Sequence, residues 1–139
     1  MRCLLDSSVL VAALSPDERH HEACKAMLLS GDHVIYSHAL LECFSTLTGK
    51  IQASADTANI LLRRTIVPRV EIVFLTPMET LDALSAARLH GVRGGGVYDY
   101  MHFAAAKKAG VGAILTLNTG DFTHLVRKGK NDPEIRLPI

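Results

Sequence analysis

The sequence lacks an excess of charge of either sign. Lys and Arg number 15 and Asp and Glu number 14, which leaves a formal net charge of +1 at pH 7. Proteins that bind nucleic acids over a wide surface are usually strongly basic, so any basic surface here must be local. Hydrophobic residues make up 48% and charged residues 21% of the chain, which indicates a globular protein and argues against disorder.

Cysteine is also scarce. The chain has only Cys3, Cys24 and Cys43, without a CxxC pair, which argues against a disulfide framework or a zinc knuckle and favours a reducing, cytoplasmic setting. No apolar run is long enough to span a membrane, and Asp6 follows the first residues too early for a signal peptide. Repeats, low-complexity tracts and linkers are absent, so the length predicts one domain over residues 1–139.

Short apolar segments alternate with longer helical ones. We expect strands at Cys3–Leu5, His33–Tyr36, Val70–Leu75 and Ala113–Leu115, with an edge strand at Glu134–Leu137. We expect helices at about 9–14, 15–29, 39–47, 55–66, 76–90 and 97–109. Strands that alternate with helices of this length predict an α/β fold with a central, mainly parallel sheet flanked by helices.

Two of these helix starts share one capping pattern. Ser15 and Thr76 are each followed by Pro at the first helical position and by Glu three residues after the cap. This combination is typical of a helix N-terminus. Gly31 and Gly91 are expected to end the two helices.

Polar residues follow two expected strands where each strand ends. Asp6 comes directly after Cys3–Leu5, and the loop from Thr116 to Asp121 comes after Ala113–Leu115. Because sites in parallel α/β sheets lie beyond the carboxyl ends of the strands, both should open onto the same edge. Asp6 could alternatively cap the next helix, and the Asn and Gly of the loop also fit an ordinary turn.

Two further acids lie inside expected helices. Glu42 belongs to a helix that is apolar over most of its circumference, so it occupies a narrow exposed stripe or faces a polar site. Asp99 follows the glycine run 94–96 and opens a helix of small and apolar residues. Small residues imply close packing against the sheet, which would hold Asp99 near the strand ends. An Asp in a first turn also suits the helix dipole, which is the structural alternative.

Together these positions form a recognisable order: Asp after the first strand, Glu in an early helix, Tyr-Asp opening a later helix, and Thr-x-Asn-x-x-Asp-Phe after a strand. The chain resembles the PIN-domain family over nearly its whole length. Within that family it is most similar to the VapC-type toxins of type II toxin–antitoxin systems. The resemblance implies a three-layer sandwich, a metal-dependent endoribonuclease acting on RNA, a cognate antitoxin and a homodimer.

The resemblance also assigns site residues. Four acids match catalytic and metal-binding positions: Asp6, Glu42, Asp99 and Asp121. Three polar residues match supporting positions: Ser7, Thr116 and Asn118. Many relatives have Asp where this chain has Asn118, so a second metal ion would be held less firmly. Clustered carboxylates repel one another without a cation, and oxygen ligands favour Mg²⁺ or Mn²⁺, one or two ions, over zinc.

An RNA substrate needs local positive charge. The candidates are Arg93, Lys107, Lys108, Arg127, Lys128 and Lys130. Arg93 adjoins the glycine run at the expected mouth of the site, and Arg127 and Lys128 form a second basic group. Lys107 and Lys108 are better explained as solvated surface residues.

Other functions fit parts of this pattern. His38 with Glu42, and Asp99 with His102, share helical faces and could build a mixed iron or manganese site, but the paired Glu-x-x-His motifs of di-iron bundles are missing. Haloacid-dehalogenase-like phosphatases require a second Asp where this chain has Ser8. The remaining alternative is a PIN-like module of weak or no activity that binds RNA or a protein partner.

Overall fold

The structure, a computed structural model, describes all residues 1–139. Five strands form one sheet: β1 (Cys3–Leu5), β2 (His33–Tyr36), β3 (Val70–Val73), β4 (Ala113–Leu115) and β5 (Glu134–Arg136). Their order is β3-β2-β1-β4-β5, and every neighbouring pair is parallel. The chain moves outward from β1 to β3 and later returns to the other side of β1. The strand order therefore reverses between β1 and β4, which is where sheets of this kind form a binding crevice.

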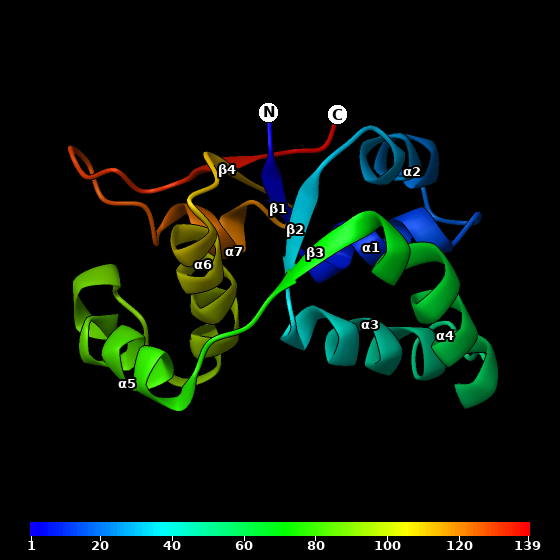
Figure 1. Ribbon diagram of the computed structural model, residues 1–139, viewed down its shortest axis with the longest axis horizontal. Helices are drawn as coiled ribbons and strands as arrows, with labels where there is room; N and C mark the ends of the chain where they lie inside the picture. Colours follow the sequence, from blue (N-terminus) through cyan, green and yellow to red (C-terminus); the bar gives the residue numbers. More distant parts are fainter.

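Helices cover both faces of the sheet, as Figure 1 shows. On one face lie α1 (Ser7–Leu14), α2 (His21–Leu29), α3 (His38–Thr48) and α4 (Ala55–Leu61). On the other lie α5 (Pro77–Ser85), α6 (Val97–Ala109) and α7 (Gly120–Thr123). The predicted three-layer α/β sandwich is confirmed. None of these helices has both the length and the apolar character needed to cross a bilayer.

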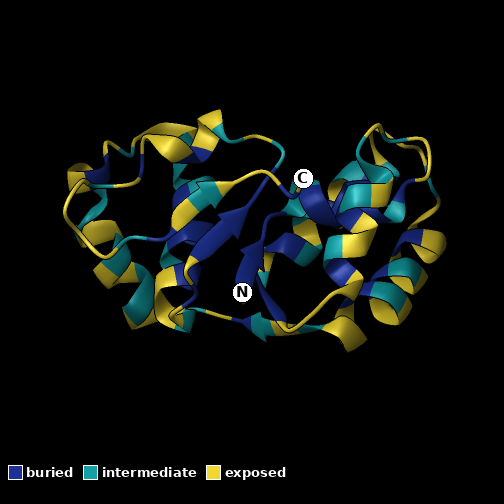
Figure 2. Ribbon diagram, turned by 90° about the horizontal axis from the view of Figure 1, so that it is seen from above, coloured by how far each residue is buried: buried dark blue, intermediate teal, exposed yellow.

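The central strands are buried on both faces, which is why they are continuous apolar runs (Figure 2). Cys3 and Leu5 pack into a core with α1, α2, α3 and the π-helical turn Leu62–Ile66, whereas Leu4 points into a second core with α6 and α7. Leu4 and Leu5 are completely buried, and each burial contributes about 1.5–3 kcal/mol to stability. These two cores hold β1 rigidly, and β1 carries Asp6 at its end.

Most of the predicted boundaries agree with the structure. Thr76 accepts a hydrogen bond from the Glu79 backbone N–H (3.1 Å), while the Glu79 carboxylate accepts one from the Thr76 N–H (2.9 Å), so the predicted capping box is present. The α-helix from this cap ends at Ser85. A 3₁₀ turn, Ala87–His90, continues to Gly91, whose φ of 67° ends the helical path as predicted.

The predicted helix start at Ser15 is wrong. Ser15 ends α1, and the chain turns through residues 16–20 before α2 begins at His21. The His21 Nδ1 atom bonds to the Ala12 carbonyl oxygen at 2.8 Å, which fixes α2 against the end of α1. This tertiary contact overrides the local capping pattern. The expected helix at 55–66 is also irregular, because α4 ends at Leu61 and continues as a π-helical turn, Leu62–Ile66.

Candidate active site

The four predicted acids reach one edge of the sheet from four separate elements. Asp6 follows β1, Glu42 lies in the second turn of α3, and Asp99 and Asp121 lie in the first turns of α6 and α7. Their proximity is visible in the pKa of Asp99, which is raised to about 6. Burial is the largest cause, followed by the negative charges of Asp6 and Asp121, with a smaller contribution from Glu42. The structure therefore brings all four acids into one electrostatic cluster.

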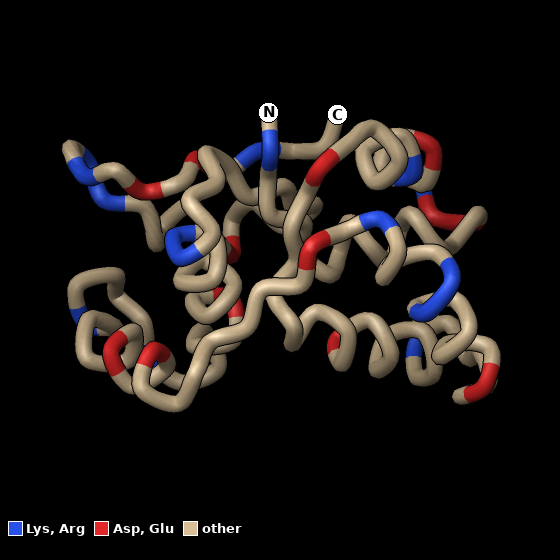
Figure 3. Tube along the Cα trace, in the orientation of Figure 1, with Lys and Arg blue, Asp and Glu red and all other residues tan.

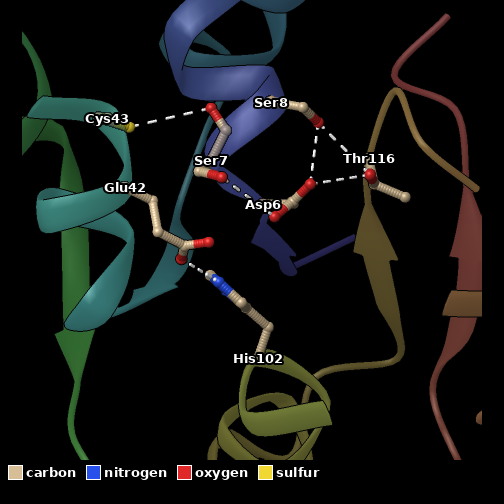
Figure 4. A network of polar contacts seen from close by, with 7 residues as sticks. All are labelled: Asp6, Ser7, Ser8, Glu42, Cys43, His102 and Thr116. Atoms are coloured by element: carbon tan, nitrogen blue, oxygen red, sulfur yellow. Dashed lines mark hydrogen bonds and ion pairs between the residues drawn. The ribbon is translucent and has the colours of Figure 1, made fainter. Parts of the chain in front are cut away.

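Asp6 is held by hydroxyl groups, as Figure 4 shows. It is only 4% exposed, and its Oδ2 atom accepts hydrogen bonds from Ser8 Oγ and Thr116 Oγ1, both at 2.9 Å. Ser7 Oγ lies 3.5 Å from the other carboxylate oxygen. The side chain makes no capping hydrogen bond to α1, although Asp6 occupies the N-cap position. The helix-cap alternative therefore does not account for this acid.

The loop after β4 is tied to the same cluster. The Thr116 hydroxyl, which donates to Asp6, accepts a hydrogen bond from the Asn118 backbone N–H at 3.0 Å. The Leu117 N–H donates to Ser8 Oγ at 3.0 Å. Ser8, in the first turn of α1, thus links Asp6 to this loop. It was not among the predicted site residues, and its only sequence signal was its position two residues after Asp6.

Glu42 faces a polar partner rather than an exposed stripe. Its Oε1 atom lies 2.5 Å from His102 Nε2, and the His102 side chain is completely buried (Figure 4). Burial works against a charged imidazole, but the hydrogen bond that His102 donates to Glu42 and the negative charges of Asp6, Glu42 and Asp99 raise the pKa of His102 above its usual value. His102 is a site residue that the sequence did not assign, although its spacing from Asp99 placed it on the same helical face.

The donor set suits a hard divalent cation, since it consists of carboxylate and hydroxyl oxygens. The raised pKa of Asp99 reflects burial and mutual repulsion, which a cation would relieve. No three Asp, Glu, His or Cys side chains, however, converge closely enough to form a ready metal site. Glu42 contacts His102 through Oε1 alone, so its other carboxylate oxygen remains available to a metal ion.

The basic candidates fall into two groups. Arg127 and Lys107 both pair with Asp132, at 3.3 and 3.1 Å, and Lys108 pairs with Glu79 at 2.7 Å. The others are exposed and form no salt bridge: Arg93, Lys128 and Lys130. Figure 3 shows the basic residues spread over separate segments of the chain rather than gathered in one place.

Comparison with known proteins identifies the family of this chain. Residues 3–128 match the family model described as the PIN domain. A comparison with curated protein sequences gives no significant match.

Solved structures with the same fold include a toxin and a toxin–antitoxin complex. VapC20 of Mycobacterium tuberculosis, described as a toxin that cleaves the sarcin–ricin loop, has a TM-score of 0.66 and 20% identity over 81% of this chain and 86% of its own. FitAcB of Neisseria gonorrhoeae has a TM-score of 0.65 and 22% identity. A toxin–antitoxin complex from Klebsiella pneumoniae has a TM-score of 0.66 and 14% identity. Each of these two matches covers 99% of this chain and 98% of the other chain. With the family model matched over most of its length, this chain belongs to the PIN domain family.

Proposed function

We propose that the protein is a metal-dependent endoribonuclease that hydrolyses RNA phosphodiester bonds in the cytoplasm as the toxin of a toxin–antitoxin pair. The observation that carries this proposal is the placement of four acids, from β1, α3, α6 and α7, at one edge of the sheet without a Lys or Arg paired to any of them: Asp6, Glu42, Asp99 and Asp121. The raised pKa of Asp99 agrees with this placement. Acids that serve only stability are usually paired with cations. Membership of the PIN family and the toxins among the structural relatives support the reaction class.

Each side chain has a distinct role in this proposal. Asp6 and Asp99 are the main ligands of Mg²⁺ or Mn²⁺, Glu42 binds the ion directly or through water, and Asp121 completes the site or orients water. When bound, such an ion lowers the pKa of water and stabilises negative charge on the phosphodiester. Three residues keep the ligands in place: Ser7, Thr116 and Asn118. Because Asn118 has no charge, any second ion would be held less firmly.

The basic residues that lie nearest in sequence to the acidic cluster would contact the RNA. Arg93 and Lys128 are exposed and form no salt bridge, so they are available for phosphate groups. Arg127 is a weaker candidate because it is paired with Asp132. It would have to leave this carboxylate to bind an RNA phosphate.

An antitoxin partner is part of the same proposal, because a toxin–antitoxin complex is among the similar solved structures. An apolar groove of about 460 Å³ lies between α3 and α4, with Leu41, Phe44 and Val67 among its walls. Leu41 is 62% exposed, so an apolar helix of a partner would bury it favourably. A neighbouring gene encoding a small protein with a DNA-binding start and a disordered, apolar-studded tail would identify this partner.

We also propose a homodimer. Helix α5 contains no buried residue and exposes Met78, Leu81 and Leu84, an apolar surface that a second copy would cover. Sedimentation equilibrium of the protein with and without Leu81→Lys tests this assignment, which predicts a dimer that the substitution dissociates.

The cleavage proposal is tested with labelled RNA and with Asp99→Asn, which keeps the shape of the side chain but removes its charge. We expect the unaltered protein to cut in Mg²⁺ or Mn²⁺ but not in EDTA, and Asp99→Asn to be inactive. Asp17→Asn, in the exposed turn after α1, is the matched control and should cut normally. RNA binding without metal-dependent cleavage would favour the alternative, an inactive PIN-like binding module.

A further inference from the structure

A groove of about 470 Å³ lies beside the acidic cluster, between α3 and the start of α6. Ser7 and Glu42 belong both to this groove and to the candidate active site, so the two are continuous. The other walls include His38, Ser45 and Tyr98. No Lys or Arg lines the groove, which makes it a poor site for a phosphate group.

Tyr98 is the residue of this groove whose exposure is hardest to explain by the fold. Its side chain is 60% exposed, although it lies in the first turn of α6 immediately before Asp99. Tyr100, two residues later, has a structural role, because it is buried and its hydroxyl donates to the Ala83 carbonyl oxygen at 2.6 Å. Tyr98 has neither the burial nor such a hydrogen bond, so the fold does not account for it.

A second ring faces the groove from α3. His38 is exposed, and its imidazole stacks on Tyr36 with 5.8 Å between the ring centres and 23° between the planes. Ser45 and Thr46 add hydroxyl groups to the same wall. Flat aromatic rings and hydroxyl groups in one groove suit the face and edges of a nucleobase.

We propose that this groove binds one unpaired nucleobase of the RNA, stacked on Tyr98, next to the phosphodiester at the acidic cluster. This inference rests on the proposed function and assigns it a base-binding site. A base inside a duplex is stacked and paired, so only an unpaired base can enter the groove. Aromatic stacking accepts any base, and specificity would come from the hydroxyl groups at the edges of the groove.

The test measures RNA binding by fluorescence anisotropy in the Asp99→Asn background, which prevents turnover. Three probes are compared: a short single-stranded RNA, the same strand with abasic residues, and the same strand in a duplex. We expect Tyr98→Ala to weaken binding of the single strand by roughly ten-fold or more, and Tyr98→Phe, which keeps the ring, to bind it as tightly as the parent. The abasic strand and the duplex should bind equally to the parent and to Tyr98→Ala.

The inference is overturned if Tyr98→Ala binds the single strand as tightly as the parent. It is also overturned if the substitution lowers the affinity for the abasic strand as much as the affinity for the normal single strand. Tyr98→Leu keeps apolar bulk without a ring and should resemble Tyr98→Ala, with an unchanged unfolding midpoint showing that the fold is intact. Cleavage of RNA by the protein with Asp99 restored tests the proposed function separately. Base-dependent binding without cleavage would reject the nuclease and retain the base site.

Discussion

Glu42 and His102, 60 residues apart in the chain, share a hydrogen bond of 2.5 Å at the centre of the acidic cluster. Glu42 comes from α3 and His102 from α6, so the pair joins the two helical layers across the carboxyl edge of the sheet. The His102 side chain is fully buried, while that of Glu42 remains 32% exposed. The imidazole therefore fixes one carboxylate oxygen of Glu42 and leaves the other facing the site.

From this pair we predict that His102 positions Glu42 for metal binding. His102→Leu removes the donor, and we expect it to lower Mn²⁺ affinity and kcat by about 10–100-fold, as losses of partners behind metal ligands usually do. His102→Gln can place an amide N–H near the same position and should retain most of both. Calorimetric Mn²⁺ titration and steady-state kinetics on RNA measure the two effects. If His102→Leu only lowers the unfolding midpoint and keeps its Mn²⁺ affinity, the histidine has a packing role alone.

Thr116 should matter through its hydroxyl group rather than its size. Thr116→Val keeps the shape but removes the donor to Asp6 and the acceptor for the Asn118 N–H. Because both partners lie at a buried or part-buried position, we expect a loss of about 1–3 kcal/mol in the free energy of unfolding, measured in urea, and at least ten-fold lower kcat. Thr116→Ser retains the hydroxyl and serves as the control. A Thr116→Val protein as stable and as active as the unaltered protein would contradict this role of the hydroxyl group.

Asp99 should destabilise the metal-free protein. Its folded pKa, about 6, lies above its usual value of 3.8, so the folded state binds the proton more tightly. Stability consequently falls as pH rises between these two values, and the full penalty applies at neutral pH. We expect Asp99→Asn to raise the free energy of unfolding without metal by about 1 kcal/mol, and to abolish the stabilisation that Mn²⁺ gives the unaltered protein. Urea unfolding with EDTA or Mn²⁺ checks both statements, and an Asp99→Asn protein stabilised by Mn²⁺ as before would contradict them.

The sequence predicted those parts of the site that depend on local order along the chain. Asp6 and Thr116 were found because each follows a buried strand, and the capping box at Thr76 requires only neighbouring residues. The pairing of Glu42 with His102 was not foreseen, because it depends on how far two helices in different layers stand apart. The helix start at Ser15 failed for a similar reason, since the His21 contact with Ala12 depends on how two helices pack.

Asp132 provides a pH-dependent test of stability away from the acidic cluster. Its side chain is 1% exposed, and although burial works against its charge, the backbone and side chain of Arg127 and the Lys107 ammonium lower the pKa of Asp132 to about 2. A folded pKa below the usual 3.8 means that the carboxylate stabilises the protein above that pH and loses this effect as pH falls toward 2.

We therefore expect Asp132→Asn to lower the free energy of unfolding by about 1–2 kcal/mol at neutral pH, because the charged interactions with its part-exposed partners are lost. The difference from the unaltered protein should shrink steadily as urea unfolding is repeated at lower pH. Glu134→Gln is the matched control, since Glu134 is exposed and pairs only with Arg136, and it should change stability little. A deficit in Asp132→Asn that stayed constant down to the most acidic condition would show that shape, and not charge, is what Asp132 contributes to this loop.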